Sequence, residues 1–327
     1  MSTSVELAQL WRGGILESRH MGHAVICNGA GEIVESWGDP DLIMFPRSSC
    51  KMIQALPLVE GGAELTEKQL ALVSASHNGA HIHTDAVTDW LSSMGLDEGD
   101  LRCGPQEPAD LEARDGLIRA GENPCQLHNN CSGKHAGFLM LNQRLGGGAE
   151  YVEVDHPVQK AVKGAMEDVC GEDAAGYGVD GCSAPNFAVT LAGLARGMGY
   201  FASAHKRSDA RSQAAARIVT SMGKFPEMVA GEGRACTALM RAMGGRVVVK
   251  TGAEAVFTAI LPEQGLGIAL KVSDGTTRGA ELAIVALLIK MGVLDAESPV
   301  ARTYWNAIQY SRRGIEAGIL TPGAAFA

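Results

Sequence analysis

Aromatic residues are scarce in this sequence, and charges of one sign never form a block. Phe, Trp and Tyr make up 5% of the 327 residues, and the formal net charge is −9. Because Lys and Arg do not cluster, nucleic acids and anionic membranes are poor candidates for a partner. The N-terminus also lacks the basic-then-apolar layout of a secretory signal peptide. We therefore expect a cytoplasmic protein that binds neither nucleic acid nor membrane.

Long hydrophobic runs are missing as well. The most apolar stretch, residues 282–294, is interrupted by Lys290 and is too short to cross a bilayer. The chain contains eight cysteines, which in a cytosolic protein are expected to be reduced, buried or metal-bound rather than paired as disulfides. With 46% hydrophobic residues, the chain can bury one large core or two modest ones.

Strand patterns occur at both ends of the chain. Residues 23–38 read as a strand, an Asn-Gly turn and a second strand, and residues 244–275 read as three strands joined by turns that contain Gly or Pro. Helical periodicity and capping signals predict helices between them and after them, at residues 66–77, 84–95, 155–171, 186–202, 209–223 and 278–292.

These patterns predict an α+β fold. The simplest assembly joins both termini into one antiparallel sheet of about five strands, with a helical region inserted between them. The whole chain, 1–327, would form a single unit. Its sheet part lies at about 1–47 and 245–327, and its helical part at about 48–244. We expect a functional site at the seam between the two parts.

One serine stands three residues before a lysine at the start of an apolar stretch, Ser48 and Lys51. Serine is also a favoured helix cap, and the Ser-x-x-Lys spacing occurs twice more, so this motif alone is weak. Two later motifs strengthen it: Ser-His-Asn at 76–78, and Lys-Thr-Gly at 250–252 on a predicted strand. The order of the three motifs is typical of serine β-lactamases and penicillin-binding proteins.

This order indicates chemistry by paired Ser and Lys side chains. Residues i and i+3 share a helix face, so Lys51 could accept the proton of Ser48 if burial and the charge of Lys250 lowered the pKa of Lys51. Ser76 could relay that proton to a leaving amine. Ser48 is either the nucleophile or an ordinary cap, and both interpretations stay open. Because the Glu-x-x-Asn motif of one lactamase class is missing, a cytoplasmic amidohydrolase fits better than a lactamase.

Several possible metal ligands lie close together in the middle of the chain. Cys125, His128, Cys131 and His135 follow one another at short intervals, and Cys182 follows later with Asp180 two residues before it. This spacing suits either a metal site or a core in which Cys and His pack together. The alternating histidines at 81 and 83 are more typical of a helix start or a solvated surface, and we leave them out of the metal site.

Together these stretches resemble one family, the class 3 or rhizobial-type L-asparaginases, which are also called asparaginase II-like. The segments that carry the resemblance are spread from residue 11 to about 255, and their order is WRGGILESRH, RSSCKMIQA, ASH, LRCG, NNCSGKH, DHPVQ, VDGC, MVAGEGRACTALMRA and KTGA. The resemblance implies an L-asparagine amidohydrolase with a serine β-lactamase/glutaminase-like fold, acting as a homodimer on a small-molecule substrate.

The resemblance also implies roles for individual residues. Ser48 corresponds to the nucleophile or its partner with Lys51 as its base, and Ser76 and Lys250 to a second Ser-Lys pair. The implied zinc ligands are two cysteines and a lysine, and the implied substrate-pocket residues lie beside them. By position, the zinc ligands are Cys131, Lys134 and Cys182, and the pocket residues are Arg47, His135 and Asp180. In this family the zinc is expected to tune substrate affinity.

The chain departs from the family pattern at two places that flank the pocket. The family's Lys-Pro is Lys51-Met52 here, and the family's Ser-His-Ser followed by an acidic residue is Ser-His-Asn followed by Gly79 and Ala80. Three hypotheses follow: an asparaginase, a glutaminase or other small-amide hydrolase with the same machinery, and a zinc-binding homologue that has lost catalysis. The intact Ser and Lys residues argue against the third.

Overall fold

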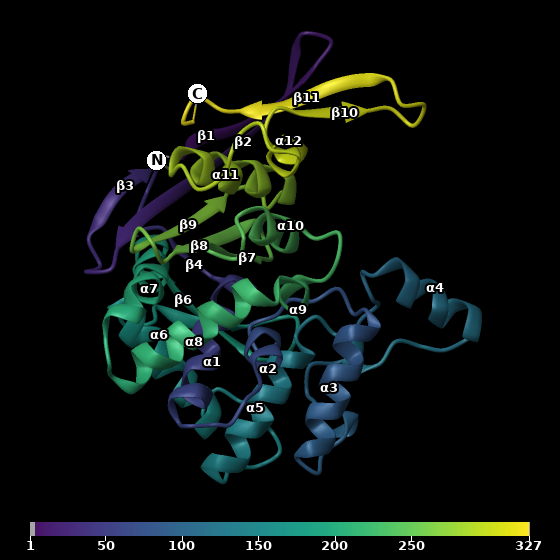
Figure 1. The fold of residues 1–327 in the computed structure, drawn as a ribbon, viewed down its shortest axis with the longest axis vertical. Coiled ribbons are helices and arrows are strands. Elements are labelled where there is room, and N and C mark those ends of the chain that lie inside the picture. The colour runs from purple at the N-terminus through teal and green to yellow at the C-terminus, as the bar shows by residue number, and fades with distance from the viewer. Residues whose placement is uncertain (1–3, 327) are drawn as a thin grey trace.

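The computed structural model describes residues 4–326, and its architecture is an antiparallel sheet beside a mainly helical part (Figure 1). The sheet has eight strands in the order β10-β11-β1-β2-β9-β8-β7, with β3 also paired to β2. They are β1 (Val5–Arg12), β2 (Ile15–Asn28), β3 (Ile33–Trp37), β7 (Val248–Gly252), β8 (Val256–Leu261), β9 (Leu266–Val272), β10 (Ala307–Tyr310) and β11 (Glu316–Pro322). The predicted α+β fold, with a sheet assembled from both ends of the chain, is confirmed.

The sheet is larger than the five strands expected from the sequence. The additional strands are β1, β10 and β11, and β1 pairs with β2 on one side and with β11 on the other. Ala8, for example, lies opposite both His20 and Pro322. The pairing of β1 with β11 joins residues about three hundred positions apart. Local sequence patterns cannot report such a partner.

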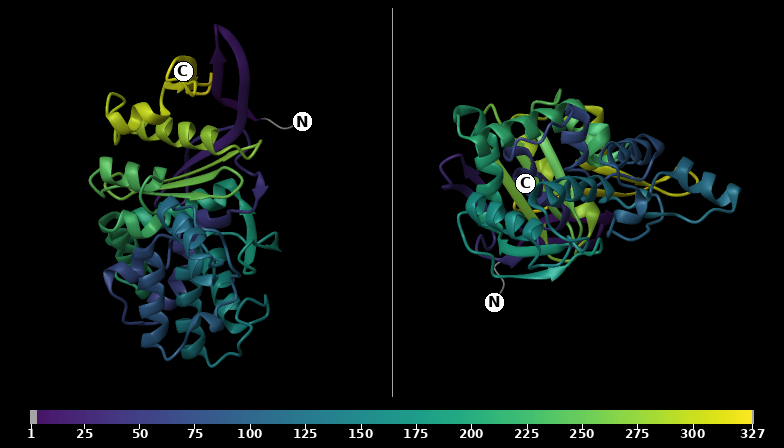
Figure 2. Two further views of the ribbon diagram at one scale, coloured as in Figure 1. Left: turned by 90° about the vertical axis from the view of Figure 1, so that its right-hand side faces the viewer. Right: turned by 90° about the horizontal axis from the view of Figure 1, so that it is seen from below.

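Two helices cover opposite faces of this sheet (Figure 2). Helix α11 (Thr277–Lys290) packs on β1, β8, β9 and β11, and helix α7 (Leu191–Ser203) packs on β2, β8 and β9. The apolar sequence of α11 is buried from Gly279 to Leu288 except at Glu281. A short helix, α12 (Pro299–Tyr304), follows and contacts α11 and β10. None of the helices in residues 4–326 has the length and hydrophobicity needed to span a bilayer.

The helical part contains most of the helices predicted from periodicity. Thr66 and Gln69 form the expected capping box at α2, and Gly171 ends α6 with a positive φ of 68°. The helices are α1 (Lys51–Glu60), α2 (Glu67–Leu72), α3 (His81–Ser93), α4 (Leu111–Ala120), α5 (Ser132–Leu145), α6 (Pro157–Cys170), α8 (Ala210–Lys224), α9 (Pro226–Ala230) and α10 (Ala235–Ala242). Four 3-10 turns accompany them: η1 (Arg47–Cys50), η2 (Glu98–Asp100), η3 (Gln126–His128) and η4 (Ala204–Lys206).

The single helix predicted at residues 186–202 is wrong in its first part. Residues Pro185–Thr190 form strand β6, which pairs with β4 (Ile43–Met44) and β5 (Gly176–Val179) in a second, three-stranded sheet. Helix α7 starts only after Thr190, whose side chain accepts the backbone N–H of Gly193. Phe187 and Val189 suit a strand because aromatic and β-branched side chains fit a pleated surface.

Helix α1 runs through the centre of the helical part. All its residues from Lys51 to Val59 are buried, and it packs against α5, α6 and α8. The preceding turn η1 contacts strand β7 of the main sheet. The segment that carries Ser48 and Lys51 therefore lies at the seam between the sheet and the helical part.

Candidate active site

A buried serine and lysine from distant parts of the sequence meet at this seam. Lys250 extends from strand β7, and its Nζ donates to Ser76 Oγ at 2.8 Å and to the carbonyl of Thr251 at 2.7 Å. Ser76 lies between α2 and α3, and its backbone N–H donates to the carbonyl of Val229 at 2.8 Å. Lys250 is only 1% exposed and Ser76 only 7%. The structure therefore brings the second predicted Ser-Lys pair into direct contact.

The environment of Lys250 favours its uncharged form. Burial, followed by the positive charge of Lys51, lowers the pKa of Lys250 to about 7. From the sequence we expected Lys250 to act on Lys51, and the structure shows that Lys51 acts on Lys250. In the structure, Lys51 Nζ instead donates to two backbone carbonyls, those of Ala75 and Asn130. Lys250 is thus the lysine that can accept a proton near neutral pH.

Ser48 lies within turn η1 and does not cap a helix. Cys50 occupies the N-cap position of α1, Pro46 occupies that of η1, and neither end has a side-chain capping bond. Ser48 is partly exposed, whereas Ser49 and Cys50 beside it are buried. No hydrogen bond joins Ser48 to Lys51 in the part of the chain that the structure describes. The capping interpretation is therefore wrong, and Ser48 is partly exposed without a capping bond.

The close approach of strand β7 to turn η1 explains why the Lys-Thr-Gly motif ends in glycine, at Gly252. A Cβ atom at this position would lie 2.8 Å from the carbonyl oxygen of Pro46 and 3.0 Å from the backbone nitrogen of Ser49. The hydroxyl of Thr258 contacts the carbonyls of Ser49 and Lys250, each at 3.2 Å. Strand β7 and turn η1 can lie this close only because Gly252 has no side chain.

A charged pair lies next to Ser48. Arg47 Nε and Nη2 donate to Asp180 Oδ1 at 3.1 and 2.8 Å, and both side chains are partly exposed. Arg47 has a φ of 53°, which is uncommon for a residue other than glycine. Its backbone N–H donates to Asn186 Oδ1 at 3.3 Å, and the amide nitrogen of Asn186 lies 3.5 Å from Asp180 Oδ2. Asn186 therefore holds both partners, although nothing in the sequence singled it out.

The two cysteines and the lysine predicted as zinc ligands are buried together. Cys131 precedes α5, Lys134 lies in the first turn of α5, and Cys182 lies in the turn that follows β5. Lys134 Nζ is 3.2 Å from Cys182 Sγ, and the thiol of Cys131 donates to Asn130 Oδ1 at 2.9 Å. Each of the three side chains is at most 5% exposed.

The remaining metal-ligand candidates behave differently. Cys125 and His128 pair with each other, Sγ to Nδ1 at 3.3 Å, at turn η3. His83 is fully buried rather than solvated, and its ring stacks on that of His77 at 4.6 Å. Within residues 4–326, no three His, Cys, Asp or Glu side chains converge as a metal site. All eight cysteines are free, as the sequence led us to expect.

The electrostatics of this cysteine cluster are those of a buried ion pair. The thiol hydrogen bond from Cys131 and the positive charge of Lys134 hold the pKa of Cys182 well below its ordinary value, whereas the pKa of Cys131 is raised. Burial opposes the charge of Lys134, but the negative charges of Cys182, Cys131 and Asp180 together outweigh it and raise the pKa of Lys134. A soft divalent cation would find one thiolate ready here, and would displace protons from the other two groups.

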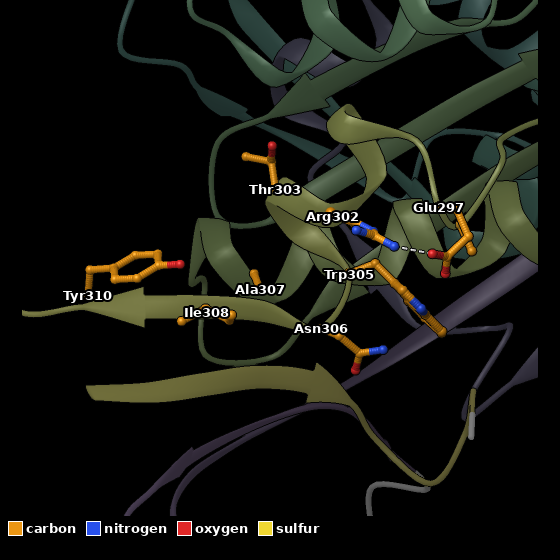
Figure 3. A pocket seen from close by; sticks show the side chains of 9 residues that line it. Glu297, Arg302, Thr303, Trp305, Asn306, Ala307, Ile308 and Tyr310 are labelled. Atoms are coloured by element: carbon orange, nitrogen blue, oxygen red, sulfur yellow. Dashed lines mark hydrogen bonds and ion pairs between the residues drawn. The ribbon is translucent and has the colours of Figure 1, made fainter. Parts of the chain in front are cut away.

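A separate surface hollow lies away from these residues. It has a volume of about 580 Å³ between α12 and β10, and residues such as Arg302, Trp305 and Tyr310 line it (Figure 3). It contains none of the Ser, Lys or Cys residues described above. We therefore assign the candidate active site to the seam and not to this hollow.

Comparison with known proteins gives a family match over nearly the whole chain. The family model described as L-asparaginase II matches residues 8–322. A comparison with curated proteins found no match. Among solved structures, the protein Mglu aligns with a TM-score of 0.47 and 16% identity over 85% of this chain and 68% of Mglu. The same protein in its glutamate form aligns with a TM-score of 0.48 and 15% identity over 85% of this chain and 62% of that structure's chain. A β-lactamase from Mycobacterium bovis aligns with a TM-score of 0.44 and 14% identity over 82% of this chain and 94% of the β-lactamase chain.

Proposed function

The chain belongs to the L-asparaginase II family of amidohydrolases, and we propose on this premise that it hydrolyses L-asparagine to L-aspartate and ammonia. The observation that carries the proposal is the buried hydrogen bond of 2.8 Å between Lys250 Nζ and Ser76 Oγ. An amine with a pKa of about 7 beside a hydroxyl is suited to proton transfer at neutral pH.

In the proposed reaction, Ser48 Oγ attacks the side-chain carbonyl carbon of asparagine. Its proton passes through the Ser76 hydroxyl to the unprotonated amine of Lys250. The ammonium that forms returns a proton through Ser76 to the amide nitrogen, and ammonia leaves. Water then attacks the aspartyl ester on Ser48, and the same pair accepts its proton. The bond between the acyl carbon and Ser48 Oγ breaks, the pair returns the proton to Oγ, and L-aspartate leaves. This assignment is supported by the partial exposure of Ser48 and by the burial of Ser76.

Lys51 has a fixed electrostatic role in this scheme. Its ammonium joins the carbonyls of Ala75 and Asn130, the first of which directly precedes Ser76. It therefore holds the loop that carries Ser76 against the segment that precedes Cys131. Its charge also contributes to the lowered pKa of Lys250.

Recognition of an amino-acid substrate is assigned to the pair of Arg47 and Asp180. The guanidinium can bind an α-carboxylate and Asp180 Oδ2 can bind an α-ammonium, because a zwitterion presents the complementary charges. Arg47 directly precedes Ser48 in the sequence. Cys182 shares a turn with Asp180, since the N–H of Asp180 donates to the carbonyl of Ala184 at 3.0 Å. His135 is fully buried and directly follows Lys134, whose Nζ lies 3.2 Å from Cys182 Sγ.

Zinc is the cofactor that we propose for the cysteine cluster. Two buried thiols and a buried amine, the amine 3.2 Å from one of the sulfurs, form a donor set that suits this metal, and Cys131, Lys134 and Cys182 would hold it. A bound zinc ion would supply positive charge near the substrate pocket. Because Cys182 lies on the turn of Asp180, fixing its sulfur would also fix the carboxylate that binds the substrate.

Ammonia release from L-asparagine and L-glutamine, measured in parallel on the purified chain, tests the proposed function. We expect a higher kcat/KM on L-asparagine. A higher value on L-glutamine would establish the glutaminase hypothesis in its place. No ammonia from any amino-acid amide, with and without added zinc, would instead favour a zinc-binding homologue that has lost catalysis.

The activity is expected to rise with pH through about 7. The unprotonated form of Lys250 is the base, so kcat/KM should increase as Lys250 loses its proton, with an acid limb near its pKa of about 7. Lys51→Met should move this limb to higher pH, because removing a neighbouring positive charge raises the pKa of Lys250. Profiles of kcat/KM from pH 5.5 to 9 decide the matter, and a rate that falls with pH across this range contradicts the assignment of the base.

Removal of zinc is expected to weaken substrate binding more than turnover. After dialysis against a chelator, the KM for L-asparagine should rise about tenfold and kcat should change less than about threefold, as for loss of a group that supports binding. Adding back zinc should restore the KM. A loss of kcat with unchanged KM would show that the metal takes part in the chemistry.

The homodimer and the cytoplasmic location stay predictions that rest on the family resemblance and the sequence composition. Size-exclusion chromatography with light scattering measures the first directly. A mass near 34.2 kDa would indicate a monomer, and twice that mass would indicate the expected dimer.

A further inference from the structure

Helix α4 projects from the body of the molecule at the end of an arm, residues 105–124 (Figure 1). Ala113 is the one residue of α4 that is buried, and the helix makes no extensive contact with another helix or strand of residues 4–326. Two of its large apolar side chains face solvent, Leu111 at 63% and Ile118 at 68% exposed. The helix therefore lacks the packed partner that the apolar face of a helix normally has.

The base of the arm, in contrast, is bound to the body by several hydrogen bonds. The N–H of Asp110 donates to the carbonyl of Asn78 at 2.9 Å, and Asn78 Nδ2 donates to Asp110 Oδ2 at 3.2 Å. The N–H of Asn130 donates to Gln106 Oε1 at 3.1 Å. Asp110 also caps α4, because its Oδ1 accepts the N–H of Ala113 at 3.0 Å. The arm thus presents α4 at a defined place outside the body.

A helix of this length needs packing to be stable. Helix α4 has ten residues, and isolated helices shorter than about 12 to 15 residues are marginal in water. Gly116 lies in its middle, where glycine destabilises a helix, although a Cβ at this position would meet no atom within 4 Å. The caps at Asp110 and Gly121 supply part of the missing stability. Contact of the exposed face with another molecule would supply the rest.

The exposed face of α4 is complementary to itself. Glu112 lies in the first turn and Arg119 in the last, seven positions apart, and Leu111 and Ile118 have the same separation. Residues seven positions apart share a face of a helix. A two-fold axis between two antiparallel copies of α4 therefore places position 112 opposite 119 and position 111 opposite 118, twice in each pair of helices.

The charges that this pairing needs are not engaged within the chain. Among residues 4–326, Glu112 and Arg119 have no ion-pair partner, whereas Arg114 Nη2 pairs with Asp115 Oδ1 at 2.9 Å. Asp115 would lie near the two-fold axis, and its pairing with Arg114 offsets the repulsion between its two copies. Because the complement of this face is the face itself, the occupant that fits it is a second copy of the chain.

We propose that α4 docks on α4 of a second copy, with Leu111 packed on the partner's Ile118 and Glu112 paired with the partner's Arg119. Such a contact is isologous and closes at a dimer. Two helices of about 15 Å bury less area than a standard interface, so the dimer is reversible, with a Kd between about 1 and 100 µM. The family resemblance led us to expect a homodimer, and the structure of α4 assigns its surface and register.

Sedimentation velocity of the purified full-length chain, from about 1 to about 200 µM, tests the proposal without any activity measurement. We expect wild type to change from 34.2 kDa to twice that mass. Arg119→Glu and Glu112→Arg should each raise the Kd at least tenfold, because each places like charges opposite one another at two positions. The double variant restores opposite charges and should dimerise within about threefold of wild type.

Arg313→Glu is the matched control, with the same change of charge at an exposed position between β10 and β11, and it should dimerise as wild type does. Circular dichroism should show equal helix content in all variants, since positions 112 and 119 are exposed. A wild type that stays at 34.2 kDa throughout would overturn the proposal and leave α4 to a partner of different sequence. A dimer that neither single variant weakens would place the interface elsewhere, and a double variant as weak as the single ones would refute the register.

Discussion

Ser48→Ala is expected to lower kcat on L-asparagine by about 10⁴-fold or more while the protein remains folded. The proposed reaction has no other hydroxyl in place to receive the aspartyl group, and losses of this size are typical when a nucleophile is removed. Ser48 makes no capping bond and is partly exposed, so the substitution removes little that stabilises the fold. Ammonia release and a thermal unfolding curve, recorded on the same preparation, measure both effects.

Ser221→Ala provides the matched control for this experiment. Ser221 also precedes a lysine by three residues, but it lies on α8, and it is 2% exposed. It should retain the activity of wild type. If Ser48→Ala kept more than about a tenth of the wild-type kcat, the acyl acceptor would have to be another group, and Ser76→Ala would be the next variant to measure.

The sequence could predict that Ser76 and Lys250 meet because motif order reports topology. Ser76 and Lys250 are 174 residues apart, yet their hydrogen bond could be anticipated from a serine before a helix and a lysine on a strand. What the sequence could not supply was the electrostatic balance between Lys51 and Lys250. The lowered pKa of Lys250 depends on its burial and on the nearby charge of Lys51, and a sequence motif reports neither.

Elements were missed where their partners lie far away in the chain. Strand β1 depends on β11 for one of its two neighbours, and β6 depends on β4 and β5. Local propensity favoured a helix through β6 because the Ala- and Leu-rich stretch after Thr190 extends the same apolar pattern. Tertiary pairing overrides such weak preferences.

The cysteine cluster shows the same limit at the level of side chains. Cys131 and His135 share a face of α5, so their common location followed from helical spacing. Cys125 and His128 fall on turn η3, whose geometry pairs them with each other.

Lys250→Met is expected to reduce kcat about 10³-fold without loss of folding. The variant removes the proposed base, whose contribution in enzymes is about 10² to 10⁴. Methionine fills a similar buried volume, and replacing a buried ionisable group by an apolar one is often tolerated. The Ser76 hydroxyl loses its partner, which should cost about 1 kcal/mol of the free energy of unfolding.

The same variant tests the lowered pKa of Lys250 through stability. Between pH 7 and 10 the folded protein keeps Lys250 unprotonated while the unfolded chain protonates it, so wild-type stability contains a component that rises with pH. Relative to Lys250→Met, the free energy of unfolding of wild type should therefore increase by up to about 1.4 kcal/mol per pH unit. Lys68→Met, at an exposed position on α2, should show no such slope. Urea unfolding at pH 7 and 9 measures the difference. Parallel curves for wild type and Lys250→Met would mean that Lys250 keeps its proton and cannot be the base.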